Sequence, residues 1–242
     1  KFMWNRQEFK FRGKQAFRRN YGASVAVALL MGIVTLFFSS NSGVNATVNQ
    51  TNYEVYSSGF DYSPSIPLIG MLVGGMALFF AVVGLLLEVF VENVLEVGGK
   101  RFFILNQTSS PSIGNILDIF KSGNYGNVVL IMFLQTLFVG LWSLLFVIPG
   151  IVKRYEYLMI PYILAENPGM DRQEVFKISK QMMDGHKMDA FVMDLSFIGW
   201  ELLGACTFGL LNVFYVNPYK EAAFAEVYAF NKQKAFEAGY IR

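Results

Sequence analysis

Cysteine and histidine are almost absent from this chain of 242 residues. Cys206 and His186 are the single residues of each type. One cysteine excludes an internal disulfide framework and a multi-cysteine metal site, and one histidine argues against a histidine-based metal or nucleophilic centre. The G-x-S-x-G, H-E-x-x-H and CxxC patterns and a phosphate-binding glycine loop are also missing. We therefore expect no metal, no cofactor and no enzymatic activity.

Charged residues are scarce as well. They make up 16% of the chain, whereas 54% of the residues are hydrophobic, and an ordinary soluble domain is about a quarter charged. The chain is thus short of polar side chains to cover a surface in water. Residues 126–148 carry no charge at all, and about 20 apolar residues suffice to cross a bilayer. The composition predicts an all-α, polytopic transmembrane helical bundle.

The first 21 residues form a basic segment that contains interspersed aromatic residues. This pattern is typical of an amphipathic helix that lies on the anionic inner leaflet, so membrane lipids are the expected partners. Lipid attraction and membrane orientation explain the positive charge, and we therefore expect no nucleic-acid partner. The basic residues assigned to the membrane surface are Arg6, Lys10, Arg12, Lys14, Arg18 and Arg19.

The remaining residues, 22–242, are expected to form a single transmembrane domain. Residues 22–38, 66–91 and 127–148 are the first three expected spans, and residues 22–38 lack the small-residue motif of a cleavage site. Lys and Arg concentrate in cytoplasmic loops, and a six-span model with both termini in the cytoplasm satisfies this rule better than a four-span model. The six-span model requires the chain to turn at Pro149-Gly150 and again near Gly209. A re-entrant hairpin over residues 150–167 is the alternative.

An internal repeat supports these two turns. The segment from about residue 113 to residue 167 aligns with residues 171–231, as two copies of a helical hairpin. The alignment pairs Gly150 with Gly209 and Pro161 with Pro218, and it also pairs Gly123 with Gly185. We therefore predict a duplicated hairpin, in which the two glycines mark turns and the two prolines interrupt helices.

Several longer stretches resemble one known family. They are "MWNRQEFKFRGKQAFRRNYG", "IPGIVKRYEYLMIPYILAENP", "SKQMMDGHK" and "LSFIGWELLGACTFGLLNVFYVNPY" with its trailing "FAEVY". In these residues the chain resembles the domain of unknown function 975 family, integral membrane proteins found mainly in Gram-positive bacteria. The resemblance implies a multi-pass protein of the cell membrane. It brings no established activity and no catalytic residues.

Polar residues within apolar segments are the candidates for ligand or ion binding, because a charge inside a membrane is costly and is usually retained for a function. These candidates are Glu88, Gln135, Lys153, Arg154 and Glu201. Structural explanations stay open. Glu88 can face cytoplasmic lysines, and Glu201 can form an ion pair with Lys153 or Arg154. Broken helices at Pro161 and Pro218 are typical of transporter sites and equally of ordinary membrane-helix kinks.

Two functions are compatible with this sequence. The first is a non-enzymatic scaffold or accessory protein that binds lipids, other membrane proteins or a second copy of itself. The alternative is a small transporter or flippase-like protein that moves an amphiphile or a small solute. A deep polar cavity that reaches Glu88, Gln135 or Glu201 would favour transport, whereas solidly packed helices would favour the scaffold.

Overall fold

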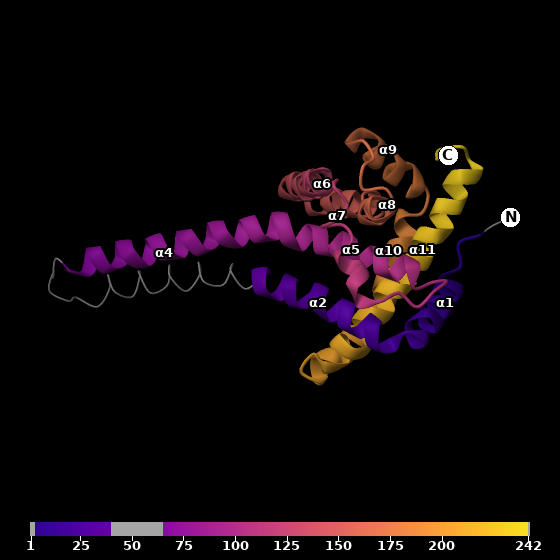
Figure 1. Cartoon of the computed structure of the whole chain (residues 1–242), viewed down its shortest axis with the longest axis horizontal. Helices are drawn as coiled ribbons and strands as arrows, with labels where there is room; N and C mark the ends of the chain where they lie inside the picture. The colour runs from indigo at the N-terminus through magenta and orange to yellow at the C-terminus, as the bar shows by residue number, and fades with distance from the viewer. Residues whose placement is uncertain (1–2, 40–64, 242) are drawn as a thin grey trace. The chain divides into compact units, whose positions relative to one another are not determined.

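The computed structural model describes residues 3–39 and 65–241, and these residues form helices and connecting segments without any strand (Figure 1). The predicted all-α class is therefore confirmed. The chain divides into two compact units: residues 1–32 together with 93–242, and residues 33–92. The expected single domain over residues 22–242 stays a prediction.

The smaller unit contains the end of α2 (Tyr21–Ser39), all of α4 (Ser65–Leu87) and the π-helical turn η1 (Glu88–Glu92). The described side chains of α4 are apolar and largely exposed, among them Leu78, Phe79 and Leu85. A water-soluble helix buries such side chains on one face, so the exposed apolar surface of α4 suggests association with a membrane. The helix continues through η1 into α5 (Asn93–Leu105) without a break.

Among the described residues, two helices are long and apolar enough to cross a membrane. They are Gly74–Leu105 and Tyr125–Leu145, and Tyr21–Ile33 is a shorter apolar helix. The expected six-span bundle is not confirmed, because the other helices of the second half are shorter or carry more charge.

The larger unit has a core built around α11 (Asn217–Glu237). The N-terminal helix α1 (Arg6–Arg19), which Asn5 caps, packs along α11, and its side chains Phe9, Ala16 and Phe17 are buried. The two helices approach very closely, because a Cβ on Gly13 would lie 2.6 Å from the Cα of Ala223. α1 is thus amphipathic as predicted, but its apolar face contacts α11.

The rest of this core comes from the short elements η2 (Ile113–Leu117), α8 (Ile160–Glu166) and α9 (Arg172–Met182), which pack with α5 and α11. α8 is almost entirely buried. It starts with Pro161 in its first turn, where a missing backbone N–H costs no hydrogen bond.

Two helical hairpins complete the larger unit. In the first, α6 (Tyr125–Leu145) is followed by α7 (Val147–Glu156), and the two helices pack together. The chain therefore turns back, as expected, but it does so at Phe146, whose backbone is extended. The predicted turn residues Pro149 and Gly150 lie instead in the first turn of α7. There Gly150 permits close contact, because its Cβ would lie 2.7 Å from the Cα of Ser143.

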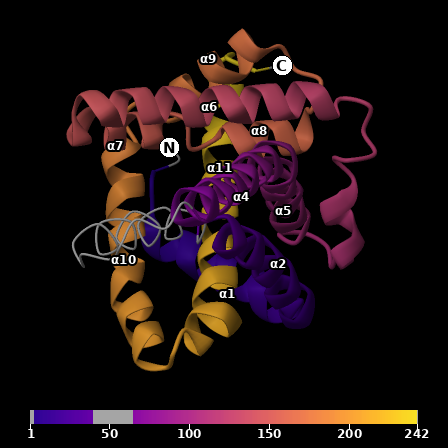
Figure 2. The ribbon, with the colours of Figure 1, turned by 90° about the vertical axis from the view of Figure 1, so that its left-hand side faces the viewer.

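The second hairpin consists of α10 (Lys187–Cys206), the π-helical turn η3 (Asn212–Val216) and α11. The turn between the arms requires a left-handed backbone at Phe208 (φ 52°) and at Gly209 (φ 83°). Glycine adopts such angles at little cost, which explains Gly209. Phe208 is fully exposed at the tip. In Figure 2, α6 lies across the direction of the α10–α11 hairpin, so the two hairpins are not parallel.

The two hairpins share local features that the predicted repeat aligns. Gly123 and Gly185, which precede α6 and α10, both have a positive φ. Pro161 and Pro218 each lie in the first turn of a helix. The duplication itself stays a prediction.

Candidate functional site

A cavity of about 380 Å³ lies inside the larger unit and is lined mainly by charged and polar side chains. We call it the charged cavity. Helices α5, α6, α7, α8, α10 and α11 all contribute to it. Its lining residues are Glu96, Lys100, Gln135, Arg154, Leu158, Pro161, Tyr162, Asp194, Glu201, Asn217, Lys220, Glu221 and Phe224.

Helical spacing explains why these side chains converge. Glu96 and Lys100 are four residues apart on α5, and Asp194 and Glu201 are seven apart on α10. Residues at these spacings lie on one face of a helix. Each helix therefore presents a polar stripe to the cavity, whereas α6 and α10 expose apolar side chains such as Leu141 and Leu202 on their outer faces.

Two lysines organise the charges. Lys100 Nζ lies 2.7 Å from Glu221 Oε2 and 3.8 Å from Glu96 Oε1. Lys220 Nζ lies 2.7 Å from Asp194 Oδ1 and 2.9 Å from Glu201 Oε1. Lys100 thus bridges a carboxylate of α5 and one of α11, and Lys220 of α11 bridges two carboxylates of α10. These ion pairs join α5 and α10 to α11.

Two polar groups of the cavity are left without such partners. The Oε1 atom of Gln135 is buried and accepts no hydrogen bond from the described residues. Arg154 is exposed at the cavity and forms no ion pair within the described part of the chain. An unsatisfied buried acceptor costs about 1–3 kcal/mol, so a bound group that donates to Gln135 would be stabilised here.

The cavity brings together three of the five predicted site residues: Gln135, Arg154 and Glu201. Lys153 points elsewhere, because its Nζ lies 2.8 Å from Glu156 Oε1 and above the ring of Trp142. Glu88 belongs to the smaller unit and is exposed. The structural alternative for Glu201 named the wrong partner, since Glu201 pairs with Lys220.

The sequence-based candidates omitted the two lysines that organise the cavity and three of its carboxylates. For Lys100 a signal was available, since Glu96 and Lys100 have the spacing of a helical ion pair. The pairing of Lys100 with Glu221 joins positions 121 residues apart, and no local pattern indicates it. No group of three or more His, Cys, Asp or Glu side chains is placed to hold a metal ion in the described ranges.

The basic residues of α1 serve partly as structural contacts. Arg19 donates hydrogen bonds to the carbonyl oxygens of Asn106 and Ser109, and Lys10 Nζ lies 3.1 Å from Ser196 Oγ. Partial burial and the neighbouring charge of Arg6 lower the pKa of Lys10. Arg12 forms an ion pair with Glu8 at 3.3 Å. Lys14 is half-buried, whereas Arg6 and Arg18 are exposed.

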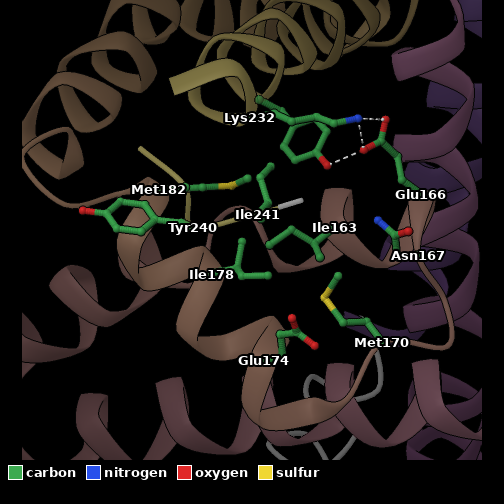
Figure 3. A pocket seen from close by; sticks show the side chains of 12 residues that line it. Ile163, Glu166, Asn167, Met170, Glu174, Ile178, Met182, Lys232, Tyr240 and Ile241 are labelled. Atoms are coloured by element: carbon green, nitrogen blue, oxygen red, sulfur yellow. Dashed lines mark hydrogen bonds and ion pairs between the residues drawn. The ribbon is translucent and has the colours of Figure 1, made fainter. Parts of the chain in front are cut away.

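A second cavity, of about 610 Å³, lies between α8, α9, α11 and the end of the described chain (Figure 3). At one end Glu166 accepts hydrogen bonds from Tyr228 at 2.7 Å and from Lys232 at 2.6 and 2.7 Å. Ile163 and Ile178 form part of its apolar wall. The polar groups at that end are therefore paired with one another, in contrast to Gln135 and Arg154 in the charged cavity.

Comparison with known families gives one match. Residues 144–233 match the family described as "Protein of unknown function (DUF975)". We call these residues, which make up less than half of the chain, the DUF975 segment. The resemblance expected from the sequence motifs is thereby confirmed. No curated protein and no solved structure matches the chain.

The DUF975 segment extends from the end of α6 to near the end of α11. It contributes most of the charged cavity, including Arg154, Glu201 and Lys220. Glu96, Lys100 and Gln135 lie before the matched residues, so the cavity is completed by α5 and α6. The description of the family names no activity.

Proposed function

We propose that this protein is an integral protein of the cell membrane whose charged cavity binds a small polar solute or the polar head of an amphiphile. In this proposal it is a binding and transport protein and not an enzyme. One observation carries the proposal: seven charged side chains line a cavity between helices whose outer surfaces are apolar.

The exposed surface supports a membrane environment. Leu144, Phe146 and Ile148 at the tip of the first hairpin expose 85%, 73% and 75% of their surface, and Phe208 at the tip of the second is fully exposed. Large contiguous apolar patches are rare on soluble monomers. Burying such side chains in lipid stabilises them by about 1.5–3 kcal/mol each.

For the topology we retain six membrane-embedded segments with both termini in the cytoplasm. α7 is ten residues long, and at about 1.5 Å per residue it reaches only half-way through a hydrocarbon core of about 30 Å. The return arm of the first hairpin is therefore broken, with α7 and α8 as its two parts. A reporter fused after Arg242 should behave as cytoplasmic, and an extracellular signal would refute this topology.

The cavity favours transport over the scaffold. It reaches Gln135 and Glu201, and its volume of about 380 Å³ falls in the range of roughly 300–1,000 Å³ usual for ligand pockets. A cavity with several charges embedded in apolar surroundings is costly to maintain, and intramembrane charges commonly mark a substrate or ion path.

The scaffold stays a second candidate because of α4. Its described side chains, such as Met76, Leu78 and Phe80, are exposed around the helix. A helix that is apolar on all sides is buried in lipid or against other helices. Contact with another membrane protein or with a second copy of the chain would account for this surface.

Native mass spectrometry of the full chain, gently extracted from its own membrane, tests the proposal. The wild type should retain one discrete small molecule or lipid, and Arg154→Ala should lose it. Lys153→Ala is the matched control, because Lys153 neighbours Arg154 in sequence but pairs with Glu156, which also keeps Lys187 at 2.8 Å. Identical bulk-lipid adducts on all three proteins would refute cavity binding and favour the scaffold.

A further inference from the structure

Building on the proposed function, we infer that the charged cavity binds a zwitterion: a molecule with a primary ammonium group and a phosphate or carboxylate group. The inference depends on the cavity having one unfilled position for a donor and one for an anion. Gln135 supplies the first, and Arg154 supplies the second.

The donor position is defined by Gln135 and by the balance of charges. Gln135 Oε1 is a buried acceptor without a donor among the described residues. In addition, the cavity contains four carboxylates and only three cationic side chains, a formal charge of −1. A ligand ammonium would donate to Gln135 and lie among the four carboxylates, whereas the anionic group of the same ligand would pair with Arg154. A hydrogen bond to a charged group contributes about 1.5–3 kcal/mol.

The anion position is defined by Arg154. Both lysines of the cavity are already bridged between carboxylates. Arg154 is the cationic side chain of the lining that has no ion pair within the described residues. The planar guanidinium group matches a phosphate or carboxylate, which it can bind through two parallel hydrogen bonds.

The two positions face one cavity because the α6–α7 hairpin brings them together. Gln135 lies on α6 and Arg154 lies on α7, and these helices pack closely where Gly150 meets Ser143. An ion that carried one charge would satisfy only one of the two positions. A purely anionic ligand would face four carboxylates, and a purely cationic ligand would leave Arg154 unpaired.

The same zwitterionic group can belong to a free solute or to a lipid head group, and two experimental arms separate these sources. In the first arm, calorimetric titration of the full chain in detergent measures the binding of phosphoethanolamine, β-alanine and glycerol phosphate. Glycerol phosphate carries the anion without the ammonium. In the second arm, native mass spectrometry counts phosphatidylethanolamine retained from nanodiscs that contain equal amounts of phosphatidylglycerol.

We expect at least one zwitterion to bind, either free or as a lipid. The matching anion without the ammonium group, glycerol phosphate or phosphatidylglycerol, should bind more weakly by about tenfold or more. Gln135→Leu and Arg154→Gln should each weaken zwitterion binding by about tenfold or more. Gln15→Leu and Arg18→Gln are matched controls on α1, where both wild-type side chains are exposed, and they should bind like the wild type.

Binding of glycerol phosphate as tight as that of both zwitterions would overturn the inference. So would zwitterion binding that is insensitive to Gln135→Leu. If neither zwitterion binds while the extracted protein still carries an Arg154-dependent adduct, the inference fails and the proposed function stands. If no adduct is found either, both fail.

Discussion

Replacing Gly150 with alanine should weaken the α6–α7 hairpin. A Cβ at this position would lie 2.7 Å from the Cα and 2.8 Å from the Cβ of Ser143. Both distances are far below van der Waals contact, and one of the atoms belongs to the backbone of α6. The new methyl group therefore requires the two helices to separate.

The expected size follows from two opposing effects. Overpacking costs about 1–3 kcal/mol, and replacing glycine in a helix returns about 0.5–1 kcal/mol. At the midpoints of these ranges the net loss is roughly 1 kcal/mol, which for a protein of this size corresponds to a melting temperature lower by roughly 2–4 °C. Gly140 on α6 is the matched control, because a Cβ there meets nothing within 4 Å. Gly140→Ala should raise the melting temperature by roughly 1–4 °C.

The assay is thermal unfolding of the purified full chain in one detergent, followed by the fluorescence of its tryptophans, one of which, Trp142, lies on α6. The test is whether the melting temperature falls for Gly150→Ala and rises for Gly140→Ala. Equal shifts in the same direction for Gly150→Ala and Gly140→Ala would refute the close α6–α7 contact.

Two further predictions concern other parts of the larger unit. Gly13→Ala should destabilise the protein by about 1–3 kcal/mol, because the new methyl group would meet the backbone of α11. Gly22→Ala is the control and should not destabilise it, because a Cβ at Gly22 meets nothing within 4 Å. Melting temperatures of the two variants in the same detergent test this prediction. Lys220→Met should cost roughly 2 kcal/mol, less than the 3–5 kcal/mol of a fully buried pair, because the three paired side chains are 21–40% exposed. Glu201→Gln should cost less than about 1 kcal/mol, because Lys220 keeps Asp194, and a greater loss than for Lys220→Met would contradict the bridging role of this lysine.

The sequence predicted those helices and turns whose formation depends on residues close together in the chain. Apolar runs predicted α4 and α6. The turn predicted near Gly209 is present, and Gly209 has a positive φ there. The first hairpin was predicted correctly as a reversal but placed at Pro149-Gly150. Proline marks the first turn of a helix as readily as a loop, and the extended residue Phe146 carries no sequence signal for a turn.

The charged cavity was only partly predictable. A charged residue in or beside an apolar segment can be recognised from the sequence alone, and Glu201 and Arg154 are examples. Its partner depends on how helices cross, and that is decided by packing over the whole unit. The sequence analysis named Lys153 and Arg154 as candidate partners of Glu201. The cation that Glu201 contacts is Lys220, 19 residues away on the other arm of its own hairpin.

The DUF975 segment, residues 144–233, does not contain a complete site. Glu221 lies within it, but the lysine 2.7 Å from Glu221 is Lys100 of α5. Gln135, which completes the proposed ligand contacts, lies on α6. An isolated segment would leave Glu221 without its cation, and removing one partner of a buried pair is strongly destabilising. The same segment would leave the face of α11 that contacts α1 at Gly13 uncovered. The part of the chain that forms the charged cavity and packs around α11 is therefore larger than the matched region and includes α1, α5 and α6.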